Sequence, residues 1–178
     1  MEARLMRGLR RACVFGLTVC AVAVLWTGAQ VYYVTRMESA LDRAARGARS
    51  KDLRDQNFDH CETWYGRLDG FNFSRAHMVG SQVRWSSFRG AVFVGADLDS
   101  SFLDYSDFSG ADMRRANLRD SSLFQATLVG ADLEGADMRR ANLAGADLRC
   151  SRLTGAELGG VRYDASTKWP DGFTPPRP

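Results

Sequence analysis

Residues 111–145 read ADMRRANLRD SSLFQATLVG ADLEGADMRR ANLAG, and every fifth residue of this stretch is a large apolar one. The register extends in both directions, from Leu53 to Tyr163, over 23 positions of which Thr63 alone is not apolar. The 17 positions from Ala76 to Ala156 that lie two residues before a large one are all Ala or Ser. Because a fixed period repeats one structural unit along the chain, it determines the architecture.

A five-residue period fits neither regular secondary structure. Five residues turn an α-helix by about 500°, so the apolar stripe would wander around the helix. On a straight strand, an odd period sends successive apolar residues to opposite faces. All of them point inward only if the chain turns a corner every five residues, so that four right-angle corners close one coil. Gly70, Gly90, Gly110 and Gly130 stand 20 apart, each two residues after a large one, where a type II turn needs a positive φ.

Several repeats follow a common pattern of Ala, then Asp or Asn, then a large apolar residue and two variable residues. Residues 111–115, 116–120 and 141–145 match this pattern as they stand. In this respect the chain resembles the pentapeptide-repeat family, most specifically between Ala76 and Tyr163. The resemblance implies an all-β solenoid, a right-handed quadrilateral β-helix, which agrees with the four-cornered coil.

We therefore expect a β-helix of about 23 five-residue repeats over residues 52–165. The unbroken register of Leu, Phe and Met argues against the alternative, a disordered low-complexity segment. A solenoid needs a cap on its last coil, and we assign residues 166–178 to a C-terminal cap and tail. Trp169 and Phe173 are the residues we expect to close the end of the bore, the interior of the stacked coils that the large apolar side chains fill.

Near the amino terminus, residues 12–34 form a run of 23 uncharged residues, long enough as a helix to cross a bilayer core of about 30 Å. We predict one N-terminal transmembrane α-helix here, an uncleaved signal anchor. It follows a basic tail at residues 1–11 and precedes a helical linker at residues 35–51. Two alternatives stay open: a buried helix, and a signal peptide cleaved near residues 27–29, which would release a secreted repeat protein.

The placement of arginine gives the expected orientation in the membrane. Four Arg precede the uncharged run and four follow it within 15 residues, so the count of basic residues ties. We place the amino terminus inside, because four Arg in an 11-residue tail resist translocation. The expected location is the cytoplasmic membrane of a bacterium, as a single-pass protein with the repeat domain on the outer, periplasmic or extracellular, side.

The net charge of +3 is unevenly distributed. Residues 1–51 carry +6, residues 52–165 carry −4 from 13 Arg and 17 acidic residues, and residues 166–178 add +1. This mixed-sign rod is not typical of a nucleic-acid-binding protein. The 20-residue spacing predicts ion pairs between coils: Arg84–Asp104, Asp99–Arg119, Arg114–Glu134 and Asp120–Arg140.

The sequence contains no set of residues typical of an enzyme. His60 and His77 are the only histidines, and neither stands with Cys61 at a spacing that suits a metal ion. The many Ser and Asp residues follow from the repeat, and no glycine-rich phosphate loop precedes a helix. We therefore expect no catalytic residues, no metal and no cofactor.

One side of the predicted rod gathers outward aromatic side chains. Stacking at 20 residues places six of them on the same one of four sides: Trp64, Tyr65, Trp85, Phe102, Tyr105 and Phe124. We call these six residues the aromatic face. Two interpretations are open: ladder packing between coils, alone or under the linker helix, and a surface that binds a protein partner.

These observations predict a membrane-anchored binding or scaffolding module that is not an enzyme, with its oligomeric state left open. The family resemblance supplies an alternative, because some pentapeptide-repeat proteins imitate duplex DNA and inhibit or protect type II topoisomerases. That role needs a strongly acidic cytoplasmic rod, whereas Arg and acidic residues are mixed in this one.

Overall fold

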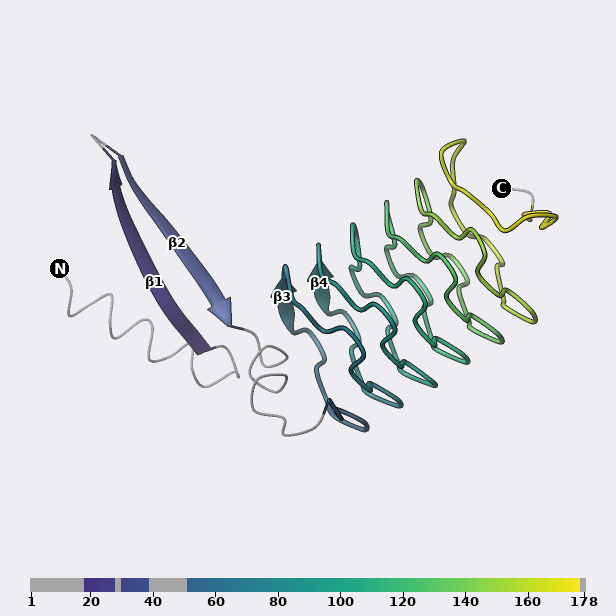
Figure 1. The fold of residues 1–178 in the computed structure, drawn as a ribbon, viewed down its shortest axis with the longest axis horizontal. Helices are drawn as coiled ribbons and strands as arrows, with labels where there is room; N and C mark the ends of the chain where they lie inside the picture. Colours follow the sequence, from purple (N-terminus) through teal and green to yellow (C-terminus); the bar gives the residue numbers. More distant parts are fainter. Residues whose placement is uncertain (1–17, 28–29, 39–50, 177–178) are drawn as a thin grey trace.

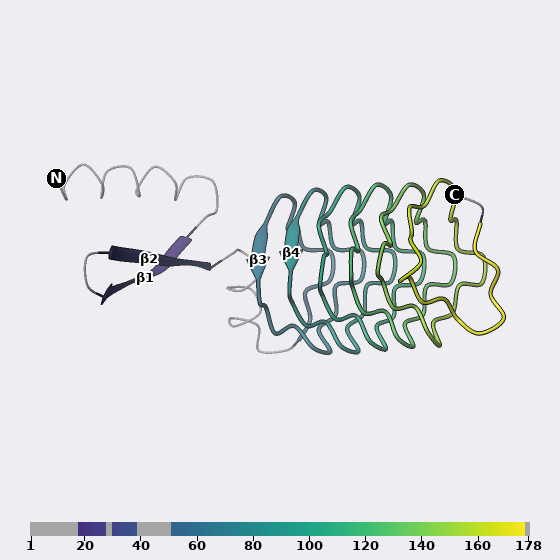
Figure 2. The same ribbon diagram turned by 90° about the horizontal axis from the view of Figure 1, so that it is seen from above.

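The computed structural model describes residues 18–27, 30–38 and 51–176. Residues 51–176 form a rod in which successive coils of the chain stack on one another (Figure 1). Seen from above, the coils remain in line from the first to the last (Figure 2). The stacked coils predicted from the five-residue period, and the all-β solenoid that the family resemblance implies, are confirmed.

Parallel backbone pairing joins each coil to the next at intervals of 20 residues. β3 (Glu62–Trp64) pairs with β4 (Gln82–Arg84) in this way. Elsewhere the pairing consists of single bridges, such as the bridge from Asp97 to Asn117. Four such rows of pairing run along the rod, one on each side of the coil.

Every corner residue from 55 to 160, at five-residue intervals, has a positive φ, as a type II turn requires. At one corner the N–H of Ala141 donates to the carbonyl oxygen of Met138 at 3.0 Å and closes the turn around Arg140. Ten of these 22 corner residues are glycines and twelve are not. Pairing with the neighbouring coils imposes the conformation, so a corner does not depend on glycine.

The core of the rod is the column of large side chains. Twenty of the 23 positions are buried, and so are the Ala and Ser residues beside them up to Ser151. Phenylalanines stack along the bore: the ring centroids of Phe73 and Phe93 lie 4.9 Å apart, and those of Phe88 and Phe108 lie 5.0 Å apart. The predicted inward direction of the apolar register is therefore correct.

The carboxy-terminal end of the rod is covered by the segment after the last repeat. One extra residue enters the register here, so that Asp147 pairs with Lys168. Trp169 packs against the core, and its ring lies 5.4 Å from Tyr163 and 5.3 Å from Phe173. The large residues of the last coil are only half-buried: Leu153, Leu158 and Tyr163. Trp169 therefore closes an end of the core that the repeats alone leave open.

The amino-terminal part differs from the predicted helix. β1 (Thr18–Thr27) and β2 (Gln30–Glu38) are strands that pair antiparallel, so the helix predicted over residues 12–34 is wrong for these segments. More than half of the residues in each strand are β-branched or aromatic, which favours a pleated strand and restricts side-chain rotamers in a helix. No helix among the described residues is long and apolar enough to cross a membrane.

β2 also takes up the first four residues of the predicted helical linker at residues 35–51. Most of the remaining linker, and all of the basic tail at residues 1–11, lie outside the described residues.

Two buried serines in one inward-facing column should have opposite effects on the free energy of unfolding when each is replaced by alanine. Ser121 Oγ donates to the carbonyl oxygen of Leu118 at 2.7 Å, whereas the buried Ser81 Oγ has no hydrogen-bond partner among the described residues. Ser81→Ala should raise the free energy of unfolding by about 1 kcal/mol, because it removes an unsatisfied buried hydroxyl. Ser121→Ala should lower it by about 1 kcal/mol. Urea titration of both variants tests this, and a loss of stability in Ser81→Ala would contradict it.

Candidate binding surface

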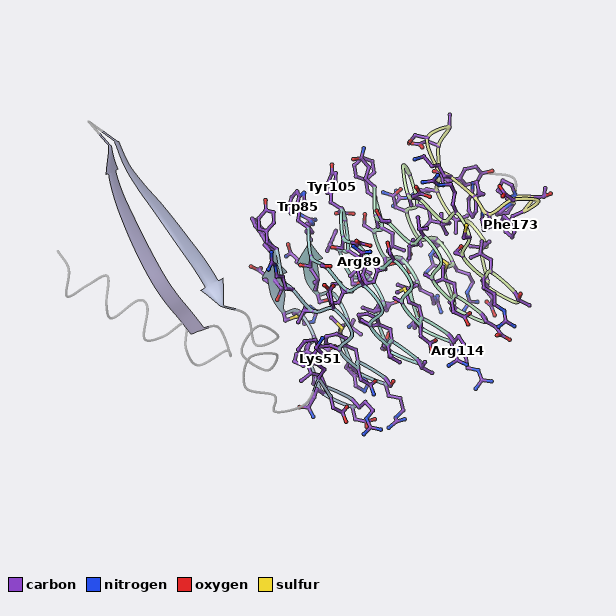
Figure 3. The ribbon with its side chains drawn as sticks, in the orientation of Figure 1. Lys51, Trp85, Arg89, Tyr105, Arg114 and Phe173 are labelled. Carbon is purple, nitrogen blue, oxygen red and sulfur yellow. The ribbon has the colours of Figure 1, made fainter. Side chains whose placement is uncertain are left out.

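Three corners of the rod carry aromatic residues directly above one another. Tyr65, Trp85 and Tyr105 occupy the same turn position in successive coils. The rings of Trp85 and Tyr105 lie 5.2 Å apart at an interplanar angle of 4°, and those of Tyr65 and Trp85 lie 5.8 Å apart at 23°. The three rings form a continuous stack along one edge of the rod, where Figure 3 labels Trp85 and Tyr105.

Two further members of the aromatic face join this stack by their edges. Trp64, the last residue of β3, lies 6.1 Å from Trp85 at an interplanar angle of 62°. Phe124 lies 5.5 Å from Tyr105 at 85°. The structure therefore brings five of the six predicted residues into one cluster, in which each ring contacts a ring of the adjacent coil.

Phe102 lies beside this cluster and is held by a charge pair. The guanidinium carbon of Arg84 lies 4.9 Å from the centre of the Phe102 ring, and Arg84 Nε is 3.2 Å from a carboxylate oxygen of Asp104. The 20-residue spacing predicted this ion pair but not its place in the aromatic face. Arg84 and Asp104 therefore belong to the surface that a partner would meet.

The aromatic face is the apolar part of the rod's surface. The large hydrophobic side chains that remain exposed among residues 51–176 all belong to it: Trp64, Tyr65, Trp85, Phe102 and Tyr105. Their exposed fractions run from 40% for Trp85 to 67% for Tyr65, while Phe124 is half-buried. The ring stacking between coils that the ladder interpretation predicts is present. Binding of a protein partner stays a prediction. Most of the linker that could cover this face lies outside the described residues.

The aromatic corners adopt a backbone conformation that bulky residues avoid. The φ angles of Tyr65, Trp85 and Tyr105 are 59°, 52° and 60°. A left-handed conformation costs an L-residue about 1 kcal/mol, which glycine does not incur. The next corner in each of these three coils is a glycine: Gly70, Gly90 and Gly110. The aromatic corners therefore carry a cost in stability that the adjacent row of corners avoids in these coils, and nine further corners of the rod carry the same cost with other residues in place of glycine.

Charged side chains cover the other sides of the rod in pairs. Of the predicted pairs between coils, Arg140 does bind Asp120, with Nε at 2.7 Å from Oδ1. Arg114, in contrast, pairs with Asp112 two residues earlier at 2.7 Å rather than with Glu134. Residues two apart on one side of a coil project in the same direction, so a long Arg side chain reaches the nearer Asp. Arg119 has Asn117 rather than Asp two residues earlier, and its Nε lies 3.9 Å from Asp137 Oδ2 in the next coil. No ion pair joins Arg119 to Asp99 among the described residues.

These ion pairs predict a loss of stability in acid. A hydrogen bond from Arg149, with a smaller contribution from Lys168, lowers the pKa of Asp147 to about 2, and hydrogen bonds from Arg114 and Arg139 lower the pKa values of Asp112 and Asp137. A depressed folded-state pKa stabilises the fold above the unfolded value, about 3.9, and that stabilisation is lost as the pH falls through the folded value.

The urea midpoint should therefore be constant from about pH 7 to pH 5 and fall steadily between about pH 4 and pH 2. Asp147→Asn should lower the midpoint at pH 7 and flatten its fall in acid. A wild-type midpoint that stays constant down to pH 2 would contradict this account.

The described residues contain no group of three or more His, Cys, Asp or Glu side chains that could hold a metal ion. A polar hollow on this part of the surface is lined by Asp52, Arg54, Asp55, Gln56 and Arg75. In it Arg75 binds Asp55 at 2.7 Å and Arg54 binds Asp52 at 2.7 Å, so its charges are already satisfied.

The repeat pattern also matches a known family. A family model described as pentapeptide repeats matches residues 91–128 and 126–162, in eight copies. Residues 91–162 of the rod are therefore pentapeptide repeats. A pentapeptide repeat protein (Rfr23) from the cyanobacterium Cyanothece 51142 covers 72% of this chain and 96% of its own, with a TM-score of 0.50 and 20% identity. This likeness shows a shared pentapeptide-repeat fold.

Two further solved pentapeptide-repeat structures are similar over part of the chain. One from Nostoc PCC 7120 is 36% identical and covers 49% of this chain and 77% of its own, with a TM-score of 0.27. A trypsin-treated variant of QnrB1, a plasmid-mediated fluoroquinolone resistance protein, is 22% identical and covers 63% of this chain and 70% of its own, with a TM-score of 0.29. No protein of curated function matches the chain.

Proposed function

We propose that this pentapeptide-repeat rod is a non-enzymatic binding or scaffolding module whose contact surface is the aromatic face. The observation that carries the proposal is the concentration of exposed large hydrophobic side chains on one side of a rod that buries nearly all the others. Trp and Tyr are the residues most enriched at the centres of binding surfaces.

Photo-crosslinking in cells tests this proposal without knowledge of the partner. A benzophenone side chain replaces Tyr105 in one variant and Arg115 in the other. Both positions are exposed corners with a positive φ, on opposite sides of the coil. We expect an adduct from position 105 and none from position 115. Equal labelling at the two positions, or labelling at 115 alone, would refute the choice of surface.

The second part of the proposal is that the chain is held at the cytoplasmic membrane, with the rod on the outer side. It is supported by the length of the uncharged run, 23 residues at 12–34, and by the four Arg that precede it. The predicted helix gives it no support, because the described residues of this run form β1 and β2. A carboxy-terminal tag tests it by cell fractionation and protease treatment of intact spheroplasts. We expect full-length protein in the membrane fraction and loss of the tag.

Two other outcomes of that experiment would replace this part of the proposal. Soluble protein that begins near Gln30 would mean a cleaved signal peptide and a secreted repeat protein. A protected tag would place the rod in the cytoplasm, where the topoisomerase alternative becomes possible. The charge of the rod does not favour that alternative, because Arg neutralises carboxylates such as Asp112, Asp120 and Asp137 that a DNA-like surface would leave free.

A further inference from the structure

The stacking geometry limits what the aromatic face can bind. Both faces of the Trp85 ring are covered, by Tyr105 at 5.2 Å and by Tyr65 at 5.8 Å. A sugar ring or a nucleobase, which binds by lying flat on an aromatic ring, finds no open face on Trp85, the central ring of the stack. The ring edges remain exposed, and in Trp and Tyr they combine an apolar body with a polar N–H or O–H group. Side chains of this kind concentrate at the boundary between water and lipid.

The aromatic face is also small for a stable protein interface. From the coil of Tyr65 to that of Phe124 the rod rises three times by about 4.8 Å, which gives a length of about 14 Å. One side of a coil is five residues wide, so the patch covers roughly 240 Å² in projection. A stable protein interface takes about 800 Å² from each partner. Contact with a bilayer to which the chain is already attached needs no such minimum area, because the contact has only to orient the rod and does not have to hold it at the membrane.

The position and charge of the patch suit a membrane surface. All six aromatic residues lie in the first four coils, and the same side of the next coil carries Asn142, Ala144 and Gly145 instead. The first four coils follow the uncharged run after a segment with four Arg, at 36, 43, 46 and 49, which suits anionic lipid headgroups. On the face itself Asp104 is neutralised by Arg84, which leaves Glu62 as the remaining carboxylate.

From these observations we infer that the aromatic face lies against the lipid bilayer, with its ring edges at the level of the headgroups and the rod axis along the membrane. The inference rests on the proposed function, which makes this face the contact surface and attaches the chain to the membrane. It gives the first four coils a membrane contact and leaves the charged sides, and the coils beyond Phe124, free for other partners.

Tryptophan fluorescence of the full chain in vesicles tests the inference. The chain has four tryptophans: Trp26, Trp64, Trp85 and Trp169. One variant, Trp26→Phe/Trp64→Phe/Trp169→Tyr, keeps Trp85 alone. The matched control, Trp26→Phe/Trp64→Phe/Trp85→Phe, keeps Trp169 alone. Both are incorporated into phosphatidylcholine vesicles with about one quarter phosphatidylglycerol. Lipid brominated near the headgroup should quench Trp85 roughly twofold and leave Trp169 unchanged.

A second measurement needs no substitution. Hydroxyl-radical oxidation of the unaltered chain in the same vesicles should spare Trp85 and Tyr105 relative to detergent solution, while Trp169 and Phe173 react equally in both. An unquenched, readily oxidised Trp85 in a chain that sediments with the vesicles overturns the inference and leaves the proposed function standing. If protein-sized adducts also form at position 105 in cells, the face belongs to a protein partner. A chain that stays in the supernatant overturns the membrane attachment and the inference together.

Discussion

Leu118→Asp should abolish the folded rod. Leu118 is fully buried in the middle of the bore, and its N–H donates to the carbonyl oxygen of Asp137 in the next coil at 2.7 Å. A carboxylate at this position would lose its water without a partner, at a cost of several kcal/mol, and the transfer free energy of the leucine is lost as well. The sum is comparable to the whole stability of a domain of this size, about 5–15 kcal/mol.

Far-UV circular dichroism and limited proteolysis measure this outcome. We expect the β signal to be lost and the repeat region to be digested under conditions where the wild type resists. Arg115→Asp is the matched control, because it introduces the same side chain at an exposed corner of the preceding repeat, and Asp120 already occupies such a corner at a φ of 53°. The control should change the free energy of unfolding by less than about 0.5 kcal/mol. A folded Leu118→Asp protein would refute the inward register.

Phe88→Ala should produce the second-largest effect. The buried ring of Phe88 stacks on Phe108 at 5.0 Å and meets Phe93 edge-on at 5.4 Å. Its removal leaves a cavity in a bore whose walls are fixed by backbone pairing and cannot collapse. We expect a loss of about 3–5 kcal/mol in the free energy of unfolding, measured by urea titration.

Phe102→Ala removes the same side chain from the aromatic face. Its ring is 42% exposed and contacts the guanidinium group of Arg84, so the loss should stay near 1 kcal/mol or below. Equal losses in the two variants would mean that the aromatic face is as much a part of the core as the bore itself.

The fold of the rod was predictable because its repeat combines several signals. The large residue, the small residue before it and the corner glycines each repeat in register, and backbone pairing between coils enforces the same geometry at corners without glycine, such as Trp85 and Arg140. The column of Tyr65, Trp85 and Tyr105 followed from the same arithmetic. Local rules thus agree with the global fold along the whole rod.

Other features depended on information that the period does not contain. An uncharged run satisfies the length and composition of a membrane helix and the propensities of a strand equally well, and β1 and β2 are strands. The ion pairs of Arg114 and Arg119 depended on side-chain reach rather than on coil spacing. The contact between Arg84 and Phe102 required the side-chain directions on two adjacent coils.

The central claim is that the exposed aromatic side chains serve contact rather than the fold, and the double variant Trp85→Ser/Tyr105→Ser tests it most directly. Serine is already accepted at such a corner, at Ser100 with a φ of 54°. Neither aromatic side chain points into the bore, so urea titration should show one cooperative transition with a loss of about 1–3 kcal/mol from the missing ring contacts. Loss of the cooperative transition would show that the aromatic face holds the rod together and would contradict its assignment as a binding surface.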